Sequence, residues 1–192
     1  MTTHAHLTTL DRLTADEAPD GSREILQTSL ARTGMVPHLY AAMANSPGLL
    51  GTYRSGYDDF RRGSGFDPVE QEVTFLAISR FHGCTYCMAV HSSIADRAMV
   101  PTAVTDAIRD GEPIEDIRLQ ALNHFVTAMV ETRGRPEQRE LDAFLAVGYS
   151  EAQVLEVILA IAVKTISNYT NHLFDYPLDD AFAARAWSPS AE

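Results

Sequence analysis

Two cysteines and a histidine in the stretch FHGCTYCMAVH, residues 81–91, have types and spacing that can do chemistry. Cys84 and Cys87 are the only cysteines among the 192 residues, and His91 follows four residues after Cys87. A close cysteine pair can cycle between dithiol and disulfide, supply half of a metal site, or consist of two buried thiols with no chemical role. Each of these readings requires different residues around the pair.

A helix over residues 84–98 would place these three side chains on one stripe. Cys84 and Cys87 would lie about 60° apart around the axis, and His91 about 20° from Cys84. Along the axis His91 would be about 6 Å beyond Cys87 and about 10 Å beyond Cys84. The imidazole is therefore better placed to serve Cys87, and Gly83 starts the helix with both sulfurs at the positive end of its dipole.

The redox reading depends on forming a thiolate near neutral pH. A thiol with an unperturbed pKa near 8.5 is only about 3% ionised at pH 7. Ionising half of it requires a pKa about 1.5 units lower, or roughly 2 kcal/mol of stabilisation. A helix N-terminus supplies part of this free energy, and a nearby proton acceptor supplies the rest. Such an acceptor is normally held in place by a third group.

Glu72 is the carboxylate that the sequence offers to orient His91. It lies in a predicted helix over residues 68–82, which would return antiparallel to the cysteine helix across a short turn. Glu72 and His91 would then differ by only about 3 residues, roughly 4.5 Å, along the two axes. The neighbouring Glu70 is explained by a capping box at the helix start. We therefore predict a relay from Glu72 through His91 to Cys87.

The rest of the chain is expected to supply helices that position this site, because period-2 strand patterns are absent. Residues 1–20 read as a flexible N-terminal arm, and residues 21–188 as one all-α domain. Glycine and proline breaks divide the domain into predicted helices over residues 22–33, 37–45, 47–62, 68–82, 84–98, 101–109, 115–132, 136–146, 150–173 and 178–186.

Composition and charge exclude several classes of function. The formal net charge of −11 argues against a nucleic-acid partner, which needs a basic face. The N-terminus has neither the basic nor the apolar region of a secretory signal. The most apolar run, Val154 to Val163, is too short to span a bilayer and reads as a core helix. We therefore expect a cytoplasmic protein with no membrane partner, where a close cysteine pair is catalytic or metal-binding.

The segment DPVEQEVTFLAISRFHGCTYCMAVHSSIA resembles the signature of the carboxymuconolactone decarboxylase superfamily, in its AhpD-like alkylhydroperoxidase branch. The match is a glutamate twelve residues before the first cysteine, followed by C-x-x-C-x-x-x-H; here these are Glu72, Cys84, Cys87 and His91. The flanking segments TGMVPHLYAAMANSPGLLGTY and GYSEAQVLEVILAIAVKTISNYTNHLFDYPLDDAF are similar to the terminal helices of that family. The resemblance covers roughly residues 30–185.

The resemblance implies a compact all-α, AhpD-like domain with the CxxC at the N-terminus of a central helix, assembled into trimers or hexamers. It implies reduction of a hydroperoxide at Cys87 through a sulfenic acid that Cys84 resolves to a disulfide. An external reductant, a thiol or a lipoyl- or thioredoxin-like dithiol, would regenerate the pair, with no metal and no bound cofactor. A thioredoxin-style reading instead makes Cys84 the nucleophile.

Five further residues are candidates for binding or support of the site. Tyr86 stands where some alkylhydroperoxidases carry a histidine, and His82 where a small polar residue is expected. Asn168, Asn171 and His172 fall at i, i+3 and i+4 on one face of the last long helix. That face can serve the site, or can form an interhelical hydrogen-bond cluster or a subunit contact.

Three alternatives to the peroxidase stay open from the sequence. One is a general dithiol–disulfide oxidoreductase without peroxidase activity. Another is a non-enzymatic redox sensor whose disulfide changes its homo-oligomeric assembly. A zinc site would need three or four ligands, and no second CxxC is present.

Overall fold

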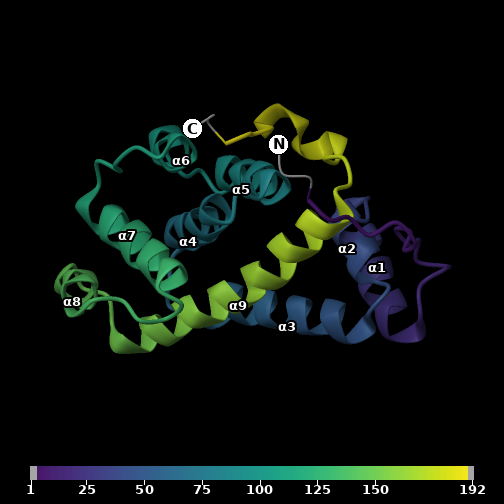
Figure 1. The fold of residues 1–192 in the computed structure, drawn as a ribbon, viewed down its shortest axis with the longest axis horizontal. Coiled ribbons are helices and arrows are strands. Elements are labelled where there is room, and N and C mark those ends of the chain that lie inside the picture. Colours follow the sequence, from purple (N-terminus) through teal and green to yellow (C-terminus); the bar gives the residue numbers. More distant parts are fainter. Residues whose placement is uncertain (1–3, 190–192) are drawn as a thin grey trace.

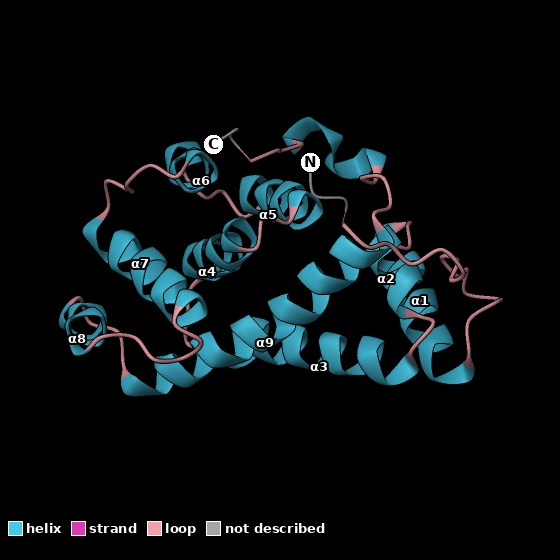
Figure 2. Cartoon of the chain, in the orientation of Figure 1, coloured by secondary structure: helices cyan, strands magenta, loops and turns pink. Residues whose placement is uncertain are grey.

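The computed structural model describes residues 4–189, and these form helices joined by loops (Figures 1 and 2). The helices in chain order are α1 Asp20–Thr33, α2 His38–Met43, α3 Pro47–Gly63, α4 Pro68–Phe81, α5 Thr85–Arg97, α6 Thr102–Asp110, α7 Ile117–Glu131, α8 Gln138–Ala146, α9 Glu151–Phe174 and the 3-10 helix η1 Asp180–Arg185. The expected all-α class is confirmed, and the predicted α-helices begin and end within two residues of the observed ones. The prediction for residues 178–186 was wrong in type, because that segment forms a 3-10 helix.

Helix α4 is the most enclosed element of the fold, and it fixes the position of the cysteine helix. Every residue from Glu70 to Ser79 is buried, so the helix has no solvent-facing stripe. It packs against α5, α6, α7 and α9. A helix buried all round belongs to the centre of a domain, so the polar groups on α4 must find partners within the protein.

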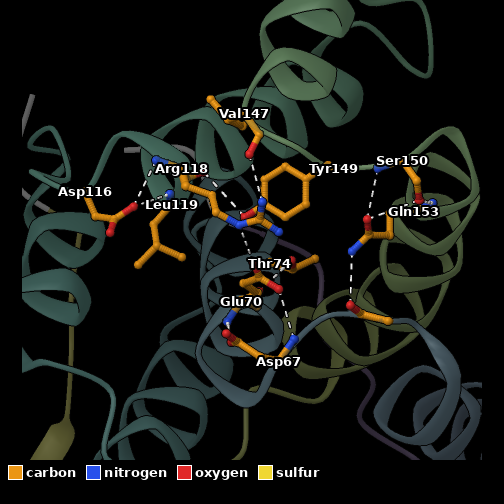
Figure 3. A network of polar contacts seen from close by, with 11 residues as sticks. Asp67, Glu70, Thr74, Asp116, Arg118, Leu119, Val147, Tyr149, Ser150 and Gln153 are labelled. Atoms are coloured by element: carbon orange, nitrogen blue, oxygen red, sulfur yellow. Dashed lines mark hydrogen bonds and ion pairs between the residues drawn. The ribbon is translucent and has the colours of Figure 1, made fainter.

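The start of α4 is tied to helix α7 and to the loop before α9 by a polar network around Arg118 (Figure 3). Glu70 closes a capping box with Asp67, as predicted, and its other carboxylate oxygen accepts a hydrogen bond from Arg118 Nε at 2.9 Å. Arg118 also donates to the carbonyl of Val147 and lies 4.0 Å from the ring centroid of Tyr149. The network therefore joins α4, α7 and the loop before α9.

A tight turn carries the chain from α4 to α5 and sets the position of the cysteines. Gly83 has a φ of +65°, a left-handed conformation that favours glycine, and its N–H donates to the carbonyl of Arg80. The N–H of Cys84 donates to the carbonyl of Ser79, and Cys84 becomes the N-cap of α5. Helices α4 and α5 consequently pack side by side.

The segments at both ends of the described chain lie against this helical core. In the predicted arm, the N–H of Leu7 donates to the carbonyl of Leu173 and the N–H of Leu13 to that of Ala41. After α9 the chain turns at Asp175, which has a φ of +45°, and runs back toward α2 and α5 before η1. The predicted flexibility of residues 1–20 stays a prediction, and residues 1–3 lie outside the described part of the chain.

Helix α9 is the one described helix long and apolar enough to cross a membrane by length and composition. Within the fold, however, it packs against α2, α3, α4 and α5. It also carries the buried polar residues Lys164, Ser167, Asn168 and Asn171. One face of α9 thus lies in the core of the domain, whereas Leu155 and Ile158 of the predicted core run are exposed.

Candidate active site

The two cysteines lie at the N-terminus of α5, inside the protein. Cys84 is the N-cap residue and Cys87 lies in the first helical turn, and both are reduced. Their side chains are only 1% and 2% exposed, in an apolar cluster that includes Tyr53 and Val163. The helix dipole favours a negative charge at this position. Burial therefore has to be offset by specific partners before either sulfur can ionise.

Helix α9 supplies those partners from across the core. The side-chain amide of Asn171 donates to Cys87 Sγ at 3.0 Å and approaches Cys84 Sγ at 3.6 Å. Ser167 Oγ lies 3.8 Å from Cys87 Sγ. The hydroxyl of Tyr176 donates to Asn171 Oδ1 and so holds the amide nitrogen toward the sulfurs. Asn171 was a sequence candidate, whereas Ser167 and Tyr176 were not.

Glu72 and His91 meet as the helix geometry predicted. His91 Nδ1 lies 2.9 Å from Glu72 Oε2, and both side chains are almost fully buried. The other oxygen of Glu72 forms an ion pair with Arg61 at 2.5 Å. The carboxylate therefore bridges a cation from α3 and an imidazole from α5. Sequence reasoning missed Arg61, because it is one of 14 arginines and nothing in its local sequence distinguishes it.

The ionisation of this pair fixes the tautomer of the imidazole. Burial acts to raise the pKa of Glu72, but the hydrogen bond with His91 and the charge of Arg61 hold it below its usual value. Burial, together with the charge of Lys164, lowers the pKa of His91 to about 4. At neutral pH a neutral His91 then donates Nδ1–H to an ionised Glu72. Its Nε2 lone pair is left free to accept a proton.

The pKa values of the two thiols are shifted in opposite directions. Burial acts to raise the pKa of Cys87, but the hydrogen bond with Cys84 and the charge of Lys164 bring it well below its ordinary value. The hydrogen bond to Cys87 and burial both raise the pKa of Cys84. Cys87 is therefore the thiolate of the pair, and Cys84 is the thiol that donates to it.

Lys164 was missed by the sequence analysis, although it is the only lysine in the chain. It directly follows the most apolar run of α9 and is 1% exposed. A single lysine in the middle of an apolar helix is a signal that the sequence alone could have given. Among residues 4–189 its Nζ has no hydrogen-bond partner.

Tyr86 is held away from the relay by the segment that follows α9. Its hydroxyl donates to Asp179 Oδ2 at 2.5 Å, and its ring packs edge-on against Tyr176. The backbone N–H of His38 also donates to the Asp179 carboxylate, at 3.3 Å to each oxygen. Tyr86 thus anchors the C-terminal segment over the cysteine helix. The sequence analysis gave Tyr86 only as a candidate for binding or support of the site.

A cavity of about 750 Å³ opens beside the site and reaches His91. Its wall is rich in aromatic side chains, including Tyr40, Tyr53, Tyr57 and Tyr86. None of the described residues that line the cavity is a cysteine. A molecule bound in the cavity would contact the imidazole and the tyrosines. The cavity has the size of a small-molecule site, and its wall combines these rings with charged side chains such as Arg54 and Asp58.

The remaining sequence candidates lie further from the sulfurs. Asn168 is buried, but both atoms of its amide lack partners in the described chain. His172 is exposed and stacks on Tyr169, and His82 packs edge-on against the same ring. None of the three makes a hydrogen bond to a cysteine within residues 4–189. The shared helical face therefore delivers Asn171 to the site but leaves His172 at the surface.

A metal site would need at least three ligand side chains close together. Within residues 4–189 no group of three His, Cys, Asp or Glu side chains is placed to hold a metal ion. His91 Nδ1 is engaged by Glu72, and the cysteine sulfurs face the Asn171 amide. The arrangement is that of a hydrogen-bonded dithiol.

Comparison with solved structures identifies proteins that share the fold of this chain. No family model and no curated protein matches the chain. Among solved structures it is similar to an alkylhydroperoxidase AhpD core, an uncharacterized peroxidase-related protein from Ralstonia eutropha JMP134, with a TM-score of 0.80 and 18% identity over 90% of this chain and 93% of that one. A peroxidase-related protein from Silicibacter sp. TM1040 gives 0.77 and 18% over 96% and 98%.

A third neighbour is the debrominase Bmp8, with a TM-score of 0.76 and 19% identity over 93% of this chain and 96% of that one. A cysteine-to-alanine variant of Bmp8 in complex with 2,3,4-tribromopyrrole gives 0.78 and 19% over 94% and 97%. At these identities the likeness establishes the fold. The chain has the AhpD-like all-α fold, with its cysteine pair at the start of α5.

Proposed function

We propose that the chain is a thiol-dependent hydroperoxide reductase of the AhpD-like branch of the carboxymuconolactone decarboxylase superfamily. The observation that carries this proposal is the contact of Glu72 with His91 next to a cysteine pair whose Cys87 sulfur accepts a hydrogen bond from Asn171. A peroxidatic cysteine needs a stabilised thiolate and a nearby proton carrier. This site provides both.

The reaction follows from the ionisation of the two thiols. The Cys87 thiolate attacks the terminal oxygen of a hydroperoxide ROOH, so that an S–O bond forms, the O–O bond breaks and Cys87 becomes a sulfenic acid. His91 Nε2 accepts a proton from solvent and passes it to the leaving alkoxide, which departs as the alcohol. The Cys84 thiol then displaces water from the sulfenic acid and forms the disulfide.

An external dithiol closes the cycle. It reduces the disulfide to the Cys84 thiol and the Cys87 thiolate, is itself oxidised to a disulfide, and releases the proton that the alkoxide consumed. The reductant is a small thiol or a lipoyl- or thioredoxin-like dithiol, and the reducing cytoplasm is the compartment that would maintain it. Each turnover therefore converts one hydroperoxide and one dithiol into an alcohol, water and a disulfide.

The cavity at His91 is the proposed substrate site. Its volume of about 750 Å³ is far larger than hydrogen peroxide requires, and its aromatic wall suits an organic group R. Glu72 keeps Nδ1 of His91 occupied, so that Nε2 is the nitrogen available to the substrate. The chain would thus prefer an organic hydroperoxide over hydrogen peroxide.

A second candidate reaction is the reductive removal of bromine from an aromatic ring. It is favoured by the four tyrosines of the cavity wall, which can stack on such a ring, and by the fold shared with the debrominase Bmp8. The same cysteine pair would supply the two electrons and would end as the same disulfide. General disulfide exchange and a redox-sensing oligomer use the pair without this cavity.

We further propose a homo-oligomer as the working form. Helix α9 carries the exposed apolar side chains Leu155, Ile158, Tyr169 and Leu173. Spacings of three, eleven and four residues place them along one side of the helix. Light scattering of the reduced and oxidised protein tests this proposal, and an assembly that changes with redox state would favour the sensor alternative.

The test of function measures substrate turnover in the presence of a dithiol. The reduced protein is supplied with cumene hydroperoxide, hydrogen peroxide or a bromopyrrole, and dithiol oxidation is followed for wild type, Cys87→Ser and Cys84→Ser. We expect cumene hydroperoxide to be the best substrate, Cys87→Ser to be inactive, and Cys84→Ser to add one oxygen at Cys87 without completing a cycle. Full turnover by Cys87→Ser would refute the mechanism, and bromide release without peroxide reduction would favour the second candidate.

A further inference from the structure

The chain's only lysine is buried on α9 and has no hydrogen-bond partner in the described part of the chain. Lys164 is 1% exposed on α9, and its Nζ makes no hydrogen bond within residues 4–189. No carboxylate in the described chain lies within 4.0 Å of it. Removing an ammonium group from water costs several kcal/mol unless an anion compensates it. A counter-ion must therefore be sought among the groups around it.

The helical register of α9 directs Lys164 to the cysteine helix. It lies three residues before Ser167 and seven before Asn171, the two residues of α9 that approach Cys87 Sγ. Residues at these spacings share one face of a helix. Its Nζ also lies 5.6 Å from the ring centroid of Phe75, and the His91 ring lies 4.8 Å from the same centroid.

Glu72, the buried carboxylate of the site, is already engaged. The oxygens of Glu72 are taken by Arg61, at 2.5 Å, and by His91, at 2.9 Å. The ionisable groups whose pKa responds to the charge of Lys164 are His82, His91, Cys84 and Cys87. A neutral histidine offers no charge, and Cys84 stays a thiol. Cys87 is the group left to carry a compensating negative charge.

We propose that Lys164 is the counter-ion of the Cys87 thiolate and that it holds the redox equilibrium of the cysteine pair toward the dithiol. The proposal rests on the dithiol chemistry proposed above, but it does not depend on which oxidant the protein uses. Lys164 acts through Cys87 and is a positioning residue for charge, with no contact to substrate.

The redox consequence follows from charge balance. When a dithiol reduces the disulfide, the S–S bond breaks, Cys84 takes one proton, Cys87 takes the negative charge and the second proton is released. The product holds a thiolate beside the ammonium of Lys164, whereas the disulfide holds no charge to compensate it. A reduced form stabilised in this way makes the disulfide a strong oxidant, which a cellular dithiol reduces readily.

Wild-type protein provides the first test, because a single lysine gives a single probe. Protein grown with isotope-labelled lysine shows one side-chain resonance for Lys164 in NMR spectra. We expect this resonance to move when the pair is oxidised, and to move similarly in reduced Cys87→Ser, which lacks the thiolate. A resonance that is the same in reduced wild type, oxidised wild type and Cys87→Ser would overturn the proposal.

The second test measures the redox equilibrium of Lys164→Met against glutathione. Methionine removes the charge with little change in shape, and Cys87 can take up a proton in the variant, so no buried charge is left unpaired and the variant is expected to fold. We expect the equilibrium to shift at least tenfold toward the disulfide, which corresponds to about 30 mV. The ionisation of Cys87, followed by thiolate absorbance, should move to higher pH in the same variant.

Ile161→Met is the matched control, because it places the same side chain one turn earlier on α9 and removes no charge. An equilibrium within twofold of wild type in both Met variants would refute the role of Lys164. If the protein reduces no hydroperoxide but Lys164→Met still shifts the equilibrium, the proposed function fails and the counter-ion role stands. These outcomes distinguish the two proposals.

Discussion

Asn171 gives the sharpest prediction about how the fold controls the reactivity of the cysteine pair. Its amide nitrogen lies 3.0 Å from Cys87 Sγ and 3.6 Å from Cys84 Sγ, and Tyr176 fixes its orientation. The change Asn171→Leu keeps a side chain of similar size and removes the donor. The variant should therefore raise the pKa of Cys87 without emptying the space.

The size of the effect follows from the hydrogen bond that is lost. A hydrogen bond to a charged group contributes about 1.5–3 kcal/mol. One pKa unit corresponds to about 1.36 kcal/mol, so the pKa of Cys87 should rise by about 1 to 2 units. A more basic thiolate is also more nucleophilic, with a Brønsted coefficient of about 0.4–0.5. The reaction rate below both pKa values should consequently fall only about 3- to 15-fold.

The assay is the rate of Cys87 alkylation by iodoacetamide as a function of pH, with tandem mass spectrometry to separate the two cysteines. The variant should react more slowly than wild type at low pH and faster at high pH, because its fully formed thiolate is the stronger nucleophile. The two pH–rate curves should therefore cross.

Thr170→Val is the control for this experiment. Thr170 is the buried neighbour of Asn171, and its hydroxyl donates only to the carbonyl of Ile166 in its own helix. Its pH–rate curve should coincide with that of wild type. If Asn171→Leu also coincides with wild type, the amide does not stabilise the thiolate. A uniform slowing at every pH, with no crossing, would show that the change alters access to the sulfur.

Three further predictions concern the supports of the site. Glu72→Gln leaves Arg61 without its buried anion, so the free energy of unfolding measured by urea titration should fall by about 3 kcal/mol. Peroxide turnover should fall by about 100-fold, because His91 loses the group that orients it. Unchanged turnover would exclude the relay. Burial lowers the pKa of His91 to about 4, so as pH falls the imidazole of the unfolded chain is protonated before that of the folded protein. The free energy of unfolding should therefore be highest above pH 6.5 and should fall by up to about 3 kcal/mol as pH decreases toward 4. His91→Gln should flatten this pH dependence, and an equal slope in both proteins would contradict it. Gly56→Ala puts a Cβ 2.9 Å from Val163 Cγ2 and should destabilise the protein by about 1–3 kcal/mol. Gly51→Ala places its Cβ in open space on the same helix and should stabilise the protein by up to about 1 kcal/mol.

Local sequence was sufficient to predict the helix boundaries, because capping and turn residues within a few positions determine where each helix begins and ends. The Asp67–Glu70 capping box and the Gly83 turn both appear where the sequence placed them. The segment after α9 was harder, because Asp180–Arg185 has no strong apolar period and forms a 3-10 helix against α5. Helix type at such a site is decided by packing.

The contact between Glu72 and His91 was also predictable, since two helices joined by a short turn have few possible registers. The sequence thereby determined the fold class, the cysteine pair, the Glu72–His91 contact and the position of the pair at a helix start. Each of these depends on residues less than 20 positions apart, for which helical geometry is a sufficient guide.

Only the tertiary structure decided which groups surround the sulfurs. Arg61 reaches Glu72 from α3, while Ser167 and Asn171 approach the cysteine pair from α9, about 80 residues away in sequence. His172 shares the helix with them but faces solvent. A helix pattern states which residues share a face, but the packing of α9 on α3, α4 and α5 selects the face that is buried. The electrostatics of Cys87 arise from that choice, because a charge acts strongly on a thiol only where packing has excluded water.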